Sequence, residues 1–169
     1  MSVKNLLNVT IVCGTIASAS LAQGGPSYDE TISFIERKAN VSLNSYVASD
    51  TGIRHSASSS VSFPNRCVLE KEHLAKDNGE VVHRTVDRLD VSDLDPSRVE
   101  IVAGQINLYI FESRREVVSR EWNEGRGWSN DKYLNSIWLN TFDRETNLPK
   151  LQRAFVHLIL LCGGQEELF

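Results

Sequence analysis

The sequence lacks the features that would assign the chain to several common functional classes. It has no cluster of lysine and arginine, and its 22 acidic residues outnumber 18 basic ones, which argues against nucleic acid or an anionic membrane surface as a partner. It contains no G-x-S-x-G motif, so a serine triad has no recognisable anchor. No run reaches the roughly 18 to 20 apolar residues of a spanning helix. We therefore expect neither integral membrane association nor a cofactor.

The first 22 residues have the composition of a secretory signal peptide. Met1 to Asn5 carries Lys4 and no acidic residue, "LLNVTIV" is apolar, and "SASLAQ" supplies small residues at a cleavage point. We predict cleavage after Ala22, which removes one base and no acid and changes the formal charge from −4 to about −5. The mature chain, residues 23–169, is then a single domain that is periplasmic or secreted.

Two segments have the pattern of helices. Ser27 and Glu30 have the spacing of a capping box, which predicts a helix from about Ser27 to Ala39. A second helix is predicted to begin near Asn147, with Pro149 in its first turn, and to stop at Gly163. Its apolar face consists of Leu148, Leu151, Phe155, Leu158, Ile159 and Cys162.

The residues between the helices predict antiparallel strands. Apolar and polar residues alternate from Ser58 onward, and hairpin turns are predicted at Asp77-Asn78-Gly79 and at Ala103-Gly104. We interpret residues 40–57 as a loop with one short strand and residues 114–135 as a long polar loop. The prediction is an α+β domain with an N-terminal helix, a curved antiparallel sheet of about five to seven strands and a C-terminal capping helix. The specific architecture predicted is a pleckstrin-homology-like roll.

Two cysteines, Cys67 and Cys162, survive cleavage of the signal peptide. Cys67 alternates with Leu69 at the start of a predicted strand, and Cys162 lies on the core-facing side of the last helix. A disulfide between them would join helix to sheet, as suits an oxidising compartment. The alternative is two unpaired thiols packed as small apolar groups. The sequence leaves both open, because it does not show whether the two Cβ atoms come close enough.

His73 and His83 form a candidate metal site. A three-residue loop at 77–79 would place them opposite one another on neighbouring strands. Two imidazoles could begin the metal centre of a small metal-dependent hydrolase, but spacing places no third ligand. The alternative is a pair of exposed strand histidines.

The stretch "EWNEGRGWSNDKY" is a candidate binding surface. Trp122, Arg126 and Trp128 lie there among polar residues and two glycines, with no alternating or helical apolar pattern. Long loops that carry aromatic residues are often binding surfaces. The alternative is that both rings fold back over a sheet edge, because tryptophans are buried on average.

The ending "RAFVHLILLCGG", together with Leu94-Asp95-Pro96 before a valine-rich strand, resembles a small domain of bacterial exported proteins without known activity. The resemblance covers about Cys67 to Gly164, and only the last dozen residues are specific. It implies export and brings no ligand or catalytic residue with it. The primary hypothesis is therefore a non-enzymatic exported module that binds a protein, a peptide or a small ligand. The metal-dependent hydrolase that uses the two histidines is the alternative.

Overall fold

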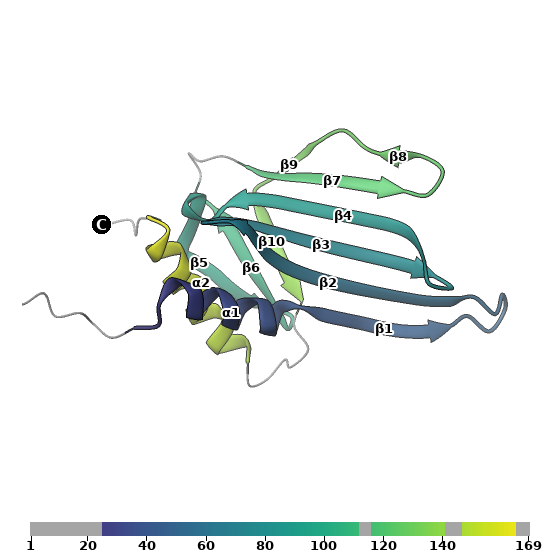
Figure 1. Ribbon diagram of the computed structural model, residues 1–169, viewed down its shortest axis with the longest axis horizontal. Coiled ribbons are helices and arrows are strands. Elements are labelled where there is room, and N and C mark those ends of the chain that lie inside the picture. The colour runs from purple at the N-terminus through teal and green to yellow at the C-terminus, as the bar shows by residue number, and fades with distance from the viewer. Residues whose placement is uncertain (1–24, 112–115, 141–146, 165–169) are drawn as a thin grey trace, which may run out of the picture.

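A computed structural model describes residues 25–111, 116–140 and 147–164 (Figure 1). The described residues form two α-helices, one short 3-10 helix and ten strands. The helices are α1 (Tyr28–Ala39), η1 (Val91–Asp93) and α2 (Leu148–Leu161). The strands are β1 (Val41–Val47), β2 (Arg54–Asn65), β3 (Val68–Asp77), β4 (Glu80–Asp90), β5 (Leu94–Val102), β6 (Gln105–Ile110), β7 (Val117–Asn123), β8 (Gly127–Trp128), β9 (Lys132–Leu134) and β10 (Ser136–Asn140).

Both predicted helices are confirmed, with the expected caps. At the start of α1, Ser27 Oγ accepts the Glu30 N–H at 3.3 Å, and Glu30 Oε2 accepts the Ser27 N–H at 2.7 Å. α2 follows its N-cap Asn147 and has Pro149 in the first turn, where a missing N–H breaks no helical hydrogen bond. Gly163, with φ of +87°, ends α2 in the left-handed conformation that glycine adopts most easily.

The strands form two antiparallel sheets. The larger has seven strands in the order β1-β2-β3-β4-β7-β8, with β9 also paired to β7, and the smaller has the order β10-β6-β5. The chain leaves the larger sheet after β4, builds β5 and β6, returns for β7 to β9 and leaves again for β10. The predicted α+β class, with helices at both ends of a mostly antiparallel sheet, is confirmed. The pleckstrin-homology-like roll stays a prediction.

The two predicted hairpin turns are present. Asn78 and Gly79 both have positive φ, at 50° and 93°, and Ala103 and Gly104 have 50° and 79°. Positive φ at both central residues gives the backbone twist that joins two antiparallel strands through two residues. Asp77 pairs with Glu80, so the β3–β4 turn has two residues, one fewer than predicted.

Two segments predicted as loops are strands. Residues 40–57 contain all of β1 and the start of β2, and residues 114–135 contain β7, β8 and β9. These segments lack apolar alternation because much of their length lies beyond the core, where neither face of a strand has to be apolar. Pairing with neighbouring strands satisfies their backbone groups whatever side chains they carry.

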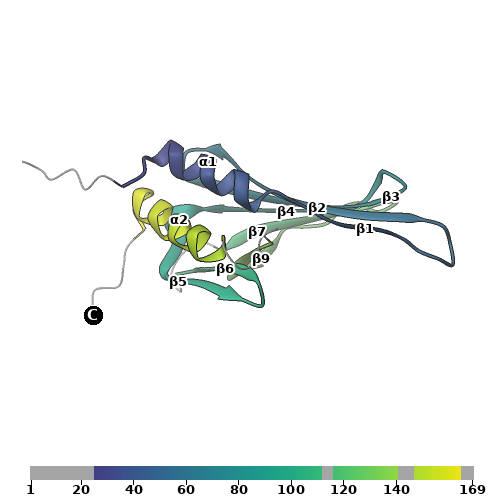
Figure 2. The ribbon, with the colours of Figure 1, turned by 90° about the horizontal axis from the view of Figure 1, so that it is seen from below.

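The hydrophobic core lies at one end of the larger sheet. Figure 2 shows α1 and α2 side by side, with α2 between α1 and the smaller sheet. α1 packs against α2 and β2, and α2 packs against β5 and β6. The largest fully buried side chains are Phe155, Ile35, Leu69, Leu94, Ile106, Leu108, Ile137, Leu139, Leu151, Leu158, Ile159 and Val61. Five of the six residues predicted for the apolar face of α2 are buried, and Cys162 packs partly buried against them.

The larger sheet extends well past this core. In Figure 1 its strands run beyond both helices and the smaller sheet, and we call this part the distal half. Directly opposed residues of antiparallel strands share a face. The inner face is the one that carries Val61, Leu69 and Leu89 into the core, and the outer face is its reverse. The distal half has side chains on both faces that are at least partly open to solvent.

Candidate functional site

A disulfide joins Cys67 to Cys162, across 95 positions of sequence, with Cα atoms 5.6 Å apart. Of the two alternatives, the structure contains the disulfide. Cys67 lies in the β2–β3 turn with φ of 61°, so its placement on a strand was wrong. Its backbone N–H donates to Tyr28 Oη at 2.8 Å. The turn is thus held to the end of α2 by a covalent bond and to the start of α1 by a hydrogen bond.

His73 and His83 are diagonal neighbours on the inner face and do not face each other directly. His73 is opposite Thr85, and His83 is opposite Ala75, because the turn has two residues and β4 carries one extra residue near it. The ring centroids lie 6.4 Å apart at 63°. Among the described residues, no three His, Cys, Asp or Glu side chains are placed to hold a metal ion together. The two histidines thus share no third ligand in this part of the chain, and the metal-site interpretation stays a prediction.

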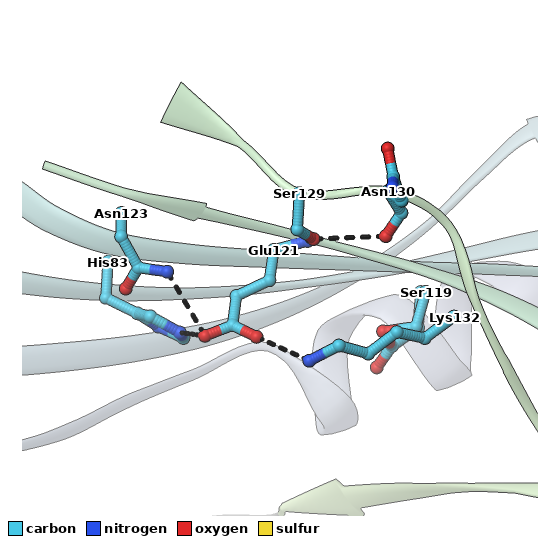
Figure 3. A network of polar contacts seen from close by, with 8 residues as sticks. His83, Ser119, Glu121, Asn123, Ser129, Asn130 and Lys132 are labelled. Atoms are coloured by element: carbon cyan, nitrogen blue, oxygen red, sulfur yellow. Dashed lines mark hydrogen bonds and ion pairs between the residues drawn. The ribbon is translucent and has the colours of Figure 1, made fainter. Parts of the chain in front are cut away.

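Glu121 is the hub of a polar network on the inner face of the distal half (Figure 3). Its Oε2 accepts from Lys132 Nζ at 2.8 Å, and its Oε1 lies 3.1 Å from His83 Nε2 and 3.3 Å from Asn123 Nδ2. These hydrogen bonds, that from Lys132 first, lower the pKa of Glu121 to about 2. We call the four residues His83, Glu121, Asn123 and Lys132 the inner polar network. The Glu121 carboxylate can orient a proton on the His83 ring. None of these four residues is a serine, threonine or cysteine that the imidazole could activate as a nucleophile.

A buried ion pair lies between this network and the core. Lys71 Nζ is 3.2 Å from Asp87 Oδ2, and both side chains are almost fully buried. Ser119 Oγ donates to Asp87 Oδ1 at 2.6 Å. The ring of Trp138, from the smaller sheet, lies 4.6 Å from Lys71 Nζ, a cation–π contact between the two sheets. Burial, followed by the charge of Lys71, lowers the pKa of His73 in the next row of the sheet.

Sequence reasoning missed Glu121, Lys132 and the Lys71–Asp87 pair. The available signal was the period of two in "VVSREWN", which puts Val117, Ser119 and Glu121 on one face of a strand. The interpretation of residues 114–135 as a loop does not use this signal.

Trp122 and Trp128 lie on the outer face, opposite to the two histidines. They are direct cross-strand partners on β7 and β8, and Arg84 of β4 is the partner of Trp122 on its other side. The Arg84 guanidinium lies 5.4 Å from the Trp128 ring centroid and forms an ion pair with Glu72. Trp122 is half-buried, whereas Trp128 is 50% exposed. We call Arg84, Trp122 and Trp128 the aromatic surface. Arg126, the third predicted binding residue, is exposed in the turn beside it.

Three hollows lie away from the aromatic surface. One of about 1080 Å³ runs between α1 and α2, from Gly25 and Asp29 to Arg37 and Lys150. A second, of about 720 Å³, lies on the outer face near the core, over Val86 and Val118. The third, of about 430 Å³, is next to Arg98 and Tyr109. None of these three is lined by Trp122 or Trp128.

No family model matches the chain, and neither a curated protein nor a solved structure matches it. Within the described ranges, no helix has the length and apolar character needed to cross a membrane.

Proposed function

We propose that the protein is an exported, non-enzymatic binding module that holds a partner protein or peptide on its aromatic surface. One observation carries the proposal: the larger sheet projects past the core and exposes a paired tryptophan, Trp128, beside an arginine. Tryptophan and arginine are the residues most enriched among those that dominate the energy of protein interfaces.

The shape of this surface favours a macromolecule over a small ligand. Small-molecule sites are concave and bury most of the ligand. Trp122 and Trp128 instead lie on the pleated face of β7 and β8, in none of the three hollows described above. The Arg84 guanidinium is held by the Glu72 carboxylate and the Trp128 ring, so it is ordered before a partner arrives. Such pre-organisation lowers the entropy lost on binding.

Export is supported by the leader-like first 22 residues and by the disulfide between Cys67 and Cys162. Disulfides persist in oxidising compartments and are rare in the cytosol of most organisms. The chain carries a modest negative charge, which fits a protein partner better than a nucleic acid.

The test compares the wild type with Trp128→Ala in affinity capture from an envelope extract of the source organism. Tyr133→Ala is the matched control, because Tyr133 is also an exposed aromatic side chain but lies on β9, outside the aromatic surface. We expect at least one partner to lose roughly tenfold or more of its retention on Trp128→Ala and none on the control. Equal retention of every captured protein by all three forms would contradict the proposal.

Stability decides whether Trp128 is a binding residue or part of a structural lid, that is, an aromatic ring folded back over the sheet edge. Because half of its side chain is exposed and β8 has only two residues, Trp128→Ala should leave the Tm nearly unchanged. A fully buried tryptophan would cost about 3–5 kcal/mol instead. A fall of many degrees in both Trp122→Ala and Trp128→Ala, measured by circular dichroism, would favour the lid.

A further inference from the structure

β1 is an open edge of the larger sheet. It stands at one end of the strand order and pairs with β2 alone. Figure 1 shows it along the lower margin of the sheet, with no element beside its outer edge in the distal half. A strand in this position has backbone N–H and C=O groups directed outward, ready to pair with another strand.

The other sheet edges among the described residues are protected. β5 carries Pro96, Arg98 and Glu100, and proline and charged side chains both oppose the addition of a strand. β8 and β9 have two and three residues, too few for a long ladder. β10 is five residues long and faces the larger sheet, where its Trp138 ring covers Lys71 Nζ.

β1 has none of these protections, although its pairing with β2 contains one irregularity of register. Its seven residues, VSLNSYV, include no charge and no proline. The pairing with β2 shifts between Leu43 and Tyr46, and both ends of the strand remain paired. Tyr46 and Val47 are 62% and 57% exposed, among the most exposed large apolar side chains of the described chain. An edge strand with these properties is a place where another strand adds.

We propose that a second copy of this chain adds there, so that two β1 strands pair antiparallel about a two-fold axis near Asn44. Two-fold dimers are the commonest assemblies, and a symmetric interface must be self-complementary. β1 meets this requirement because an uncharged strand opposes no like charge when it faces itself. The two larger sheets then form one continuous sheet.

Charges outside the strand fit the same arrangement. Antiparallel pairing centred on Asn44 brings the β1–β2 turn of one copy, which carries Asp50, beside the last turn of α1 in the other. The last turn of α1 carries Arg37 and Lys38. Asp50, Arg37 and Lys38 form no ion pair within the described chain, so their charges are available to a second copy. An interface built on seven residues of each copy is small, so we expect a reversible dimer with a Kd of about 1–100 μM.

Sedimentation equilibrium of the purified protein over roughly 1–500 μM tests the proposal. The wild type should pass from monomer to dimer across this range. Ser45 is exposed near the centre of β1, so Ser45→Lys places two like charges close to the axis and should leave the protein monomeric. Ser45→Glu should do the same, and a mixture of the two variants should restore a one-to-one dimer. Ser62→Lys, on the exposed outer face of β2 away from the edge, is the matched control and should dimerise like the wild type.

The proposal is overturned if the wild type stays monomeric at every concentration, if Ser45→Lys dimerises as the wild type does, or if the mixed variants fail to pair. Circular dichroism checks that each variant is folded. If Ser45→Lys lowers the Tm, Ser45→Glu takes its place in the same comparison, since it puts two like charges at the same position near the axis. The aromatic surface takes no part in this test, so its outcome is independent of the proposed binding function.

Discussion

The buried Lys71–Asp87 pair gives the sharpest prediction about stability. The two residues are direct cross-strand partners, and their side chains are only 6% and 7% exposed. Removing one partner leaves the other charged and buried with no counter-charge, which in proteins costs about 3–5 kcal/mol. We expect Asp87→Asn to lower the free energy of unfolding by about that amount, because asparagine keeps the shape and an acceptor for Ser119 but removes the charge.

Removing both charges should have the opposite result. Lys71→Met with Asp87→Leu replaces the pair by apolar side chains of similar size, which is neutral or stabilising by about 1–4 kcal/mol in comparable sites. The double variant should therefore be far more stable than Asp87→Asn alone. The control is Arg120→Ala, which breaks the exposed Arg120–Asp131 pair and should cost about 1 kcal/mol or less.

Urea denaturation at pH 7, followed by circular dichroism, measures all four proteins under the same conditions. The reasoning is refuted if Asp87→Asn costs no more than Arg120→Ala. It is refuted as well if the double variant is no more stable than the single one, because the penalty would then not come from an unpaired buried charge.

Three further predictions concern the disulfide, the leader and one histidine. Replacing both Cys67 and Cys162 by serine should lower the free energy of unfolding by about 4–5 kcal/mol, on the chain-entropy estimate for a loop this long, and alkylation of the oxidised protein should label neither thiol. The exported product should start at Gln23, and an intact mass that includes residues 1–22 would disprove cleavage. Because the pKa of His73 is lowered in the folded protein, the unfolded chain binds a proton near pH 6.5 that the folded chain does not yet bind. The free energy of unfolding should therefore fall as the pH drops through about 6.5. His73→Asn should weaken this dependence, whereas an NMR titration of His73 above pH 6.5 would contradict it.

Local signals in the sequence were enough to place the helices and the tight turns. The Ser27–Glu30 capping box, the apolar spacing of α2 and the residues Asn78-Gly79 each act over a few positions of the chain. Their structural effect is therefore readable without the rest of the fold. The α+β class follows from the order of these elements, helix, strands and helix.

The candidate sites depended on register, which the sequence did not determine. One extra residue in β4 and a two-residue turn moved His83 from opposite His73 to opposite Ala75. Because side chains alternate between faces, pairing across β4 and β7 also decided that Trp122 lies outside and Glu121 inside. A shift of one residue would exchange those two faces.

The sequence by itself determined where the helices begin and end, where the hairpins turn and which cysteines could pair, because caps, turns and periodicity are properties of neighbouring residues. Only the tertiary structure decided that polar segments such as β1 and β7 are strands, that Lys71 and Asp87 are buried together, and that β1 stands at the edge of the larger sheet. The physical reason is that a strand is completed by backbone hydrogen bonds to a distant part of the chain. Those bonds also form where the side chains are serine or asparagine, so they leave little trace in the local pattern of residues.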